Sequence, residues 1–362
     1  MALPKTIRDK LFLMEEVINF PTSLLSHKNY HWENLSMVPY SDLTGAVASL
    51  FDKGRKVTIV TGFYVPVGEP PATETDGPPG ALILAEGLKY MGMEVSLLSD
   101  EYTLPTLKAG LNILHLSEKE IPLISFPIEH SDQNHTRRMN NEEIESPLSL
   151  RFTEDFFNGP LGTDLTHLIY IERVGPNHTL DSFLAHERQS KPLLEDFEVI
   201  LPPRMRNRCF SSRLEDITRF TGKTHFLLKI QKRLGLPIES IGIGDRGNEM
   251  GAGKIPWEIF RDHSANDREA IFCCRMKTHY FISCGISNWG GYALLAGVAL
   301  AMGKLDILEK ITPEQEKKVL DHLIHHGPAI DGITRKQEHS VDGIEFNDYM
   351  KVIERVKEIA FR

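Results

Sequence analysis

The feature that most constrains the fold is a strand-like run that ends in glycine and is followed by a loop and a helix-like segment. Residues 56–62 are KVTIVTG, a β-branched apolar run typical of a buried strand. Apolar residues then recur at helical spacing over residues 81–91, and a second strand-like run follows at 94–98. This order predicts a right-handed βαβ unit with parallel strands. Ligands are therefore expected at the carboxyl ends of the strands.

The same alternation continues along the chain. Two further strand candidates, at 167–171 and 240–244, each end in an acidic residue, Glu172 and Asp245. Apolar periodicity then predicts helices in the C-terminal part of the chain. These helices are 292–302, 313–326 and 346–361, the second of them with Thr312 and Pro313 as N-cap and first residue.

Together these patterns predict an α/β fold, with a mostly parallel sheet flanked by helices. The domain is expected to span residues 46–362, because strand and helix patterns alternate there. Residues 1–45 contain short helical patterns broken at Pro21 and Pro39, and they are expected to form an N-terminal helical extension. The polar stretch at 129–159 is interpreted as a surface excursion that carries no chemistry.

The charge balance argues against two classes of partner. The formal net charge of -9 disfavours binding to nucleic acid or to an anionic membrane surface. No apolar stretch reaches about 18 residues, so no membrane span is expected. The four cysteines are too few for a disulfide framework, and acidic residues near the N-terminus do not fit a targeting peptide. The expectation is a mature chain in the reducing cytoplasm.

The most glycine-rich loop follows the strand at 240–244, where residues 242–253 are GIGDRGNEMGAG. The loop formally matches GxGxxG, but Asp245 and Glu249 lie where a dinucleotide would place its phosphates, which argues against a Rossmann site. A P-loop is rejected as well, since Ile255 stands where Ser or Thr would bind magnesium. A loop with this negative charge is better suited to a cation.

Asp245, Asn248 and Glu249 offer three hard oxygen donors within five residues, which suits Mg²⁺ or Mn²⁺ better than zinc. Taken alone, such a loop is more typical of a solvated acidic turn. Further acids follow other predicted strands, and loops after parallel strands converge on one edge of the sheet. These further acids are Glu69, Glu74 and Asp76 after the first strand and Glu172 after the third. Carboxylates gathered in one cleft repel each other unless a cation or an arginine compensates, so acid–arginine surface pairs remain an alternative.

Two later segments combine glycines with polar residues. Residues 287–291 (SNWGG) follow an apolar strand candidate at 280–284 and precede a helix. Their amides can point at a ligand above the helix N-terminus, and a simple helix cap is the alternative. Residues 331–334 and 340–343 are ordinary turns by propensity.

Taken together, these segments resemble the D-glutamate cyclase-like family, and they occur in the same order. The matching motifs are Thr61-Gly62-Phe63, residues 74–81 (ETDGPPGA), Ile171-Glu172-Arg173, residues 242–253, residues 287–291, Asp331-Gly332 and Val341-Asp342-Gly343. The resemblance runs from about residue 50 to residue 345. It implies an α/β enzyme that converts D-glutamate to 5-oxo-D-proline with loss of water, and relatives that bind a divalent metal. One departure is Arg246, which stands where the family's loop is expected to carry glycine.

Ring closure of glutamate needs a deprotonated amine and an activated carboxylate. We expect a divalent metal, Mg²⁺ or Mn²⁺, to polarise the γ-carboxylate, and Glu172 to take the proton from the amine. The expected catalytic residues are Glu172, Asp245 and Glu249, and the expected metal ligands are Glu74, Asp76, Asp245, Asn248 and Glu249. The α-carboxylate is expected to be bound by an arginine or by amides at helix N-termini. The expected substrate-binding residues are Arg173, Gly80, Asn288, Gly290, Asp331 and Thr334.

Two other functions remain open at this point. A metal-dependent phosphohydrolase would use the same acids around the cation, with Arg246 and Lys254 holding phosphate. A non-catalytic amino-acid or metal sensor would need the pocket without turnover. In each case the expected partner is a small molecule, and a homo-oligomer is compatible with the sequence.

Overall fold

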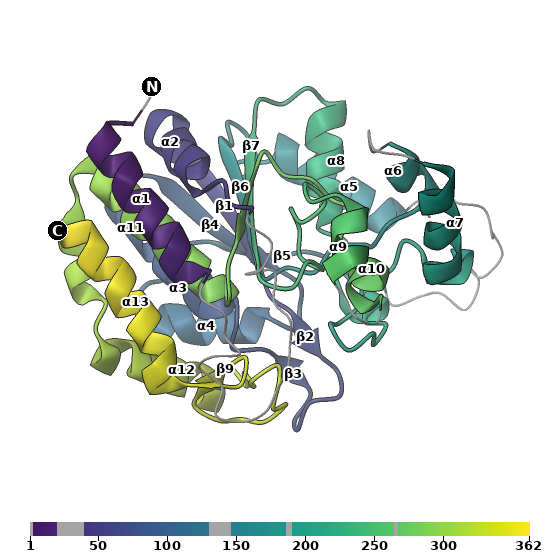
Figure 1. The fold of residues 1–362 in the computed structure, drawn as a ribbon. Coiled ribbons are helices and arrows are strands. Elements are labelled where there is room, and N and C mark those ends of the chain that lie inside the picture. The colour runs from purple at the N-terminus through teal and green to yellow at the C-terminus, as the bar shows by residue number, and fades with distance from the viewer. Residues whose placement is uncertain (1–2, 20–39, 130–145, 186–189, 264–266) are drawn as a thin grey trace.

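The computed structural model describes residues 3–19, 40–129, 146–185, 190–263 and 267–362. At the centre of the molecule is a six-stranded sheet in which all neighbouring strands run parallel, in the order β5-β4-β1-β6-β7-β8 (Figure 1). The strands are β1 (Lys56–Thr61), β4 (Glu94–Ser99), β5 (Leu123–Ser125), β6 (His167–Ile171), β7 (Glu239–Gly244) and β8 (Tyr280–Ser283). Helices cover both faces of this sheet, so the predicted α/β fold is confirmed.

The pleat of the strands divides the apolar core in two. In β1, Val57 and Ile59 pack into the larger core, whereas Val60 packs into a second core on the other face. In β6, Ile169 and Tyr170 are divided between the cores in the same way. Because both faces are covered, these strands are buried almost throughout and carry apolar residues on both faces.

The larger core lies between the sheet and a layer of long helices. They are α1 (Lys5–Ile18), α2 (Leu43–Lys53), α3 (Pro78–Tyr90), α4 (Leu104–Ile113), α11 (Ser287–Met302), α12 (Pro313–His326) and α13 (Phe346–Phe361). In the middle of this layer α11 contacts α1, α2, α3 and α13 (Figure 1). Residues 287–299 of α11 are all buried, which explains why this helix has no polar face.

The N-terminal helix is part of this layer. Leu11 and Met14 of α1 are fully buried in the larger core, and α1 packs on α11 and α13. Pro21 and Pro39, where the helical patterns were expected to break, lie outside the described residues.

The second core is covered by a different set of helices and is rich in aromatic rings. The helices on this side are α5 (Pro147–Asn158), α6 (Leu180–Leu184), α7 (Lys191–Ile200), α8 (His225–Arg233), α9 (Trp257–His263) and α10 (Arg268–Phe272). Phe183 stacks on Phe197, and both rings meet the edge of Trp257. The expectation of a surface excursion at 129–159 was wrong for residues 147–158. These residues form α5, because its phenylalanines supply an apolar face that packs beside α8. Residues 130–145 lie outside the described residues.

Two small hairpin pairs lie beside the carboxyl edge of the sheet. One pairs β2 (Tyr64–Val65) with β3 (Ala72–Thr73), and the other pairs β9 (Ser340–Val341) with β10 (Ile344–Glu345). Ile330 joins the two regions, since its amide donates to the carbonyl of Thr73 at 3.0 Å and its carbonyl accepts from Thr75 at 2.7 Å. The C-terminal loops are thereby held against the loop that follows β3. In the part of the chain that the structure describes, the connections also contain the 3-10 helices η3 (Pro203–Met205), η4 (Thr218–Phe220) and η5 (Leu305–Lys310).

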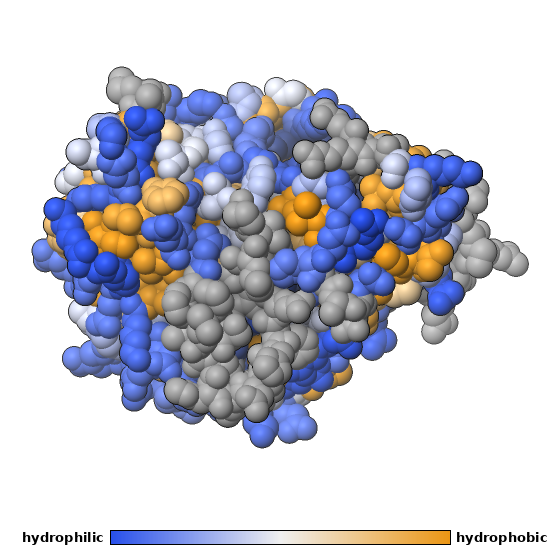
Figure 2. All heavy atoms as spheres, viewed as in Figure 1, coloured by the Kyte–Doolittle hydropathy of each residue, from blue (hydrophilic) through white to orange (hydrophobic). Residues whose placement is uncertain are grey.

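The surface in Figure 2 is mostly hydrophilic, with apolar areas over the terminal helices at the left and over the short helices at the right. Among the side chains that contribute exposed apolar area are Phe12 of α1, Val199 of α7 and Phe361 of α13. Within the described residues, no helix combines the length and the apolar character that crossing a membrane requires.

Candidate active site

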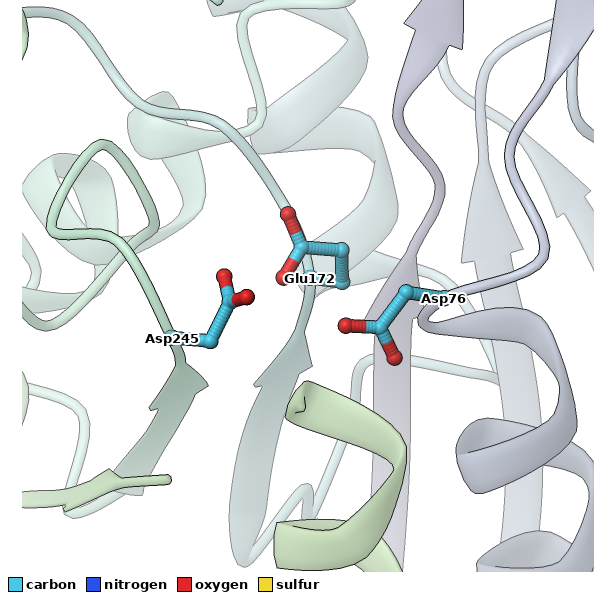
Figure 3. Close-up of side chains that lie close together, drawn as sticks. All are labelled: Asp76, Glu172 and Asp245. Carbon is cyan, nitrogen blue, oxygen red and sulfur yellow. The ribbon is translucent and has the colours of Figure 1, made fainter. Parts of the chain in front are cut away.

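Three carboxylates meet at the carboxyl edge of the sheet. Glu172 directly follows β6, Asp245 directly follows the adjacent strand β7, and Asp76 lies in the loop between β3 and α3. One carboxylate oxygen of each lies within 4.8 Å of the others, and Figure 3 shows the three side chains turned toward one another. All three are buried, with at most 4% of Glu172 exposed. We call Asp76, Glu172 and Asp245 the acidic trio.

The local backbone explains how the trio comes so close together. A Cβ at Gly77 would lie 2.8 Å from the Cβ of Glu172 and 2.8 Å from Oγ1 of Thr61, and Gly77 itself has a φ of 94°. Only glycine tolerates both conditions, so it lets the loop carrying Asp76 reach the end of β6. Glu172 itself adopts a φ of 43°, which is unusual for a side chain other than glycine.

The N-terminus of α11 holds two members of the trio. The amides of Ser287 and Asn288 each donate to Asp76 at 2.8 Å, and the amide of Gly77 donates at 2.9 Å. The hydroxyl of Ser287 donates to Oε2 of Glu172 at 2.5 Å. Unpaired amides and the helix dipole favour a negative charge at this place, so α11 stabilises the ionised form of Asp76.

The site carries more negative charge than the surrounding protein compensates. Burial raises the pKa of Asp76, Glu172 and Asp245 well above their ordinary values. Repulsion adds to this effect, chiefly from Asp342 on Asp76 and from Asp245 on Glu172. Burial, followed by repulsion from Asp342, also raises the pKa of Glu74. A bound cation would relieve this repulsion.

The donor atoms fit a hard divalent cation. Oδ2 of Asp245 is buried and accepts no hydrogen bond, although Nε of Arg246 lies 3.5 Å from it. Oδ1 of Asn248 is also buried without a hydrogen-bond partner, while its Nδ2 donates to the carbonyl of Phe210 at 2.9 Å. Carboxylate and amide oxygens are the donors that Mg²⁺ and Mn²⁺ prefer. These residues could therefore hold such an ion.

Arg246 partly compensates the acids. It pairs with Asp342 at 2.9 Å and lies near Asp245, and it is 9% exposed. Burial opposes its charge, but the two aspartates outweigh burial and raise its pKa. The β9–β10 hairpin thus supplies the partner of the arginine that replaces the glycine expected from the resemblance.

The acids open into a small cavity, in which the space open to the centre of a water-sized sphere is about 40 Å³. Glu74, Glu172, Asp245 and Asp342 contribute carboxylates to its wall, and Tyr64 and Asn248 line it as well. Three arginines, Arg213, Arg246 and Arg335, also line it. A cavity with both charges and this little space suits a small zwitterionic or anionic molecule.

Comparison with known proteins shows the family of the chain. The family model described as "D-glutamate cyclase-like, C-terminal" matches residues 23–200 and 203–357. The chain belongs to the D-glutamate cyclase-like C-terminal family. A human protein named "D-glutamate cyclase, mitochondrial" is 23% identical over 334 residues, which are 84% of this chain and 46% of that protein. The chain therefore spans about half the length of this relative. The human relative is named as a mitochondrial protein. The cytoplasmic location expected from the sequence of this chain therefore stays a prediction.

In this D-glutamate cyclase-like chain, the predicted metal ligands Glu74 and Glu249 lie outside the trio, and each has a different role in the structure. Glu74 lines the cavity, and its carboxylate lies so close to Gly332 that a Cβ there would be 1.9 Å from Oε2. Glu249 accepts the amides of Arg246 at 3.2 Å and Gly247 at 2.8 Å. Glu249 therefore shapes the turn that carries Asp245, and it is not part of the acidic trio.

The residues expected to bind substrate in the family are largely engaged with the protein itself. Arg173 pairs with Asp100 at 2.6 Å and donates to the carbonyls of Gly62 and Gly222. The amide of Gly80 donates to Oδ1 of Asn288 at 2.8 Å. None of the six residues expected to bind substrate lines the cavity.

The remaining expected residues have similar surroundings. Gly290 packs on the sheet, where a Cβ would lie 2.4 Å from Cγ2 of Ile243. Asp331 accepts the amides of Ile333 and Thr334 at 2.8 Å each, and it ties this turn to the β9–β10 hairpin through Ser340. Oγ1 of Thr334 is buried without a hydrogen-bond partner. These contacts explain the structure of the loops without a ligand.

Several residues of the cavity were not singled out as site residues by the sequence. Asp342 belongs to a turn that propensity describes as ordinary, and its repeated Asp-Gly pattern is the signal that could have marked it. Ser287 was noted for its amide, whereas its hydroxyl on Glu172 was not expected. Arg213 and Arg335 carry no recognisable motif.

Proposed function

We propose that this chain closes D-glutamate into 5-oxo-D-proline with loss of water. The observation that carries the proposal is the acidic trio, three buried carboxylates at one edge of a parallel sheet, beside a cavity that also contains arginines. Family membership supports the same reaction, because the family and the human relative are named for it.

In the proposed reaction the amine nitrogen attacks the γ-carboxyl carbon, so one C–N bond forms and one C–O bond breaks. The nitrogen loses two protons and the departing oxygen gains two, so water leaves and nothing is oxidised or reduced. Glu172 accepts the first proton from the amine. Burial suits it to this role, since a carboxylate with a raised pKa is a stronger base. The same carboxyl then donates this proton to the departing oxygen, and it carries the second proton from the nitrogen to that oxygen in the same way.

Asp76 and Asp245, with Oδ1 of Asn248, would hold the divalent cation. When bound, such an ion polarises the γ-carboxylate and offsets the charge that develops on its oxygens. In the proposed complex the substrate is bound folded, with amine and γ-carboxyl carbon close together, which lowers the entropy cost of ring closure.

The geometry gives less support to a phosphohydrolase. Lys254, expected to hold phosphate in that reaction, pairs with Asp42 at 2.6 Å and donates to the carbonyl of His279. Arg246 pairs with Asp342. Both cations are thus engaged with acids or carbonyls of the protein.

The test is incubation of the purified chain with D-glutamate, L-glutamate or a generic phosphate ester, each with Mn²⁺, with Mg²⁺ or with a chelator. We expect 5-oxoproline from D-glutamate in the presence of a cation, and its loss in the chelator. Glu172→Gln should lower kcat by about 100-fold or more, because the proton acceptor is removed. Glu354→Gln, at an exposed position of α13, is the matched control and should leave kcat unchanged. Free phosphate without 5-oxoproline would contradict the proposal.

A further inference from the structure

The cavity contains an arginine pair that neither the sequence motifs nor the proposed chemistry uses. We propose that Arg213 and Arg335 bind the α-carboxylate of the substrate, and so restrict the site to amino acids whose α-carboxylate is free. This inference rests on the proposed ring closure and assigns a different part of the same cavity. Both side chains line the cavity together with Glu172 and Asp245.

The groups first expected to bind this carboxylate are engaged elsewhere. The amides of Ser287 and Asn288 at the start of α11 donate to Asp76. The amide of Gly80 donates to Asn288, and the guanidinium of Arg173 is bound by an aspartate and two carbonyls. Among the described residues that line the cavity, the arginines are therefore the candidates for binding the α-carboxylate.

Arg335 has a donor that lacks an acceptor. Its Nη2 pairs with Glu215 at 2.7 Å, but its Nε is buried and makes no hydrogen bond. A buried N–H without a partner is costly, and a carboxylate in the cavity is the kind of group that would satisfy it. The backbone of Arg335 is fixed on both sides, because its amide donates to Asp331 at 2.8 Å and its carbonyl accepts from Glu69 at 2.9 Å.

Arg213 bonds both to the loop that carries Arg335 and to the loop that carries Glu215. Its Nη2 donates to the carbonyl of Ile333 at 2.6 Å, and its amide donates to Oγ of Ser211. The hydroxyl of Ser211 in turn donates to Glu215, the partner of Arg335. The two guanidinium groups are thus positioned by one network before any ligand binds. Guanidinium groups are well matched to a carboxylate, which accepts two parallel hydrogen bonds.

The test compares D-glutamate with its α-amide, in which a neutral carboxamide replaces the α-carboxylate and ring closure is still feasible. For the wild type we expect kcat/KM to be about 100-fold lower for the α-amide. Arg335→Gln and Arg213→Gln should lower kcat/KM for D-glutamate through KM, and should leave the α-amide nearly unchanged. In each variant the ratio between the two substrates therefore falls toward one.

Arg335→Lys should restore part of the preference for D-glutamate, because it keeps the charge without the planar group. Arg204→Gln removes an exposed arginine of the same connecting region and should keep the full ratio. Thermal unfolding of each variant identifies one that fails to fold, and the other arginine then decides the test.

The outcomes separate this inference from the proposed function. If the wild type cyclises both substrates equally well, the arginine assignment is overturned while the ring closure stands. If the wild type cyclises neither, the proposed function fails, and calorimetric binding of D-glutamate and of its α-amide to the wild type and to Arg335→Gln tests the assignment directly. The assignment is supported if the wild type binds D-glutamate more tightly than the α-amide and the variant loses this preference. It is overturned if the wild type binds the two ligands equally well or binds neither.

Discussion

At the scale of single residues, the site contains two groups with different roles. The acids face one another, and other polar residues hold the surrounding loops in place. Asn288 belongs to the second group. Its Oδ1 accepts the amides of Gly77 at 2.9 Å and Gly80 at 2.8 Å, and its Nδ2 donates to the carbonyl of Thr75 at 3.0 Å. The residue thereby ties the loop that carries Asp76 to the start of α11.

Replacing Asn288 with alanine should lower the free energy of unfolding by about 2–4 kcal/mol, because two amides and one carbonyl lose their partners inside the protein. Urea unfolding measures this change. Asn158→Ala, at an exposed residue whose side chain bonds only a carbonyl of its own helix, is the control and should change stability by less than about 0.5 kcal/mol. Unchanged stability of Asn288→Ala together with a raised KM for glutamate would instead make it a substrate-binding residue.

The acids of the trio were accessible to sequence reasoning, but the positions of the other polar residues were not. Glu172 and Asp245 directly follow apolar strands, and parallel strands place such residues at one edge. Arg173, by contrast, is engaged by Asp100, and its partner is set by how loops pack. The arginines of the cavity lie in loops whose approach to each other depends on tertiary contacts, and local sequence patterns do not encode those.

At the scale of elements, boundaries followed the sequence where local signals were strong. The helix predicted at 313–326 is α12 with the same bounds, and Oγ1 of Thr312 caps it by accepting from Gln315. The helix predicted to start at 292 begins at 287. Its glycines look like a turn, yet Gly291 is needed where α11 crosses α3, because a Cβ there would lie 3.1 Å from Cα of Gly80.

The contact between α11 and α12 gives a prediction about pH. Glu316 of α12 accepts a hydrogen bond from Tyr292 of α11, and burial raises the pKa of Glu316 to about 7. In the folded state Glu316 keeps its proton up to about pH 7, whereas in the unfolded state it loses the proton near its ordinary pKa of about 4.5. The stability that protonated Glu316 contributes is therefore fully present below about pH 4.5 and is lost as the pH rises through 7.

Glu316→Gln should remove this pH dependence. Near pH 5 the free energy of unfolding of the variant should equal that of the wild type. At pH 8 the free energy of unfolding of the variant should be about 2–3 kcal/mol higher than that of the wild type. Glu314→Gln, on the exposed side of the same helix, serves as the control and should keep the wild-type profile. Urea unfolding at several pH values measures the difference, and parallel profiles for Glu316→Gln and the wild type would contradict this reading of the contact.

At the scale of the whole molecule, helices from both ends of the chain cover one face of the sheet. Buried side chains of α1 contact α11, and a Cβ at Gly297 of α11 would lie 2.7 Å from Cδ2 of Leu11. The acidic trio lies at the N-terminus of that same α11. The terminal helices therefore support the helix on which the site depends.

Leu11→Ala should lower the free energy of unfolding by about 2–4 kcal/mol, because it leaves a cavity in the larger core. The neighbouring Phe12 is 59% exposed, so Phe12→Ala is a matched control that should be nearly neutral. Urea unfolding of both variants provides the comparison. Equal, small effects would mean that α1 adds little to the fold.

The central claim is that Asp76 and Asp245 of the acidic trio hold a divalent cation, and calorimetric titration with Mn²⁺ tests it most directly. Asp245→Asn keeps the shape of the side chain but removes a charge next to a rigid strand end, so Mn²⁺ affinity should fall by at least about tenfold. Without metal its thermal midpoint should stay equal or rise, since repulsion among the carboxylates is relieved. Asp155→Asn, at an exposed residue of α5, should bind Mn²⁺ like the wild type. Equal affinity of Asp245→Asn and the wild type, or no binding to the wild type, would contradict the claim.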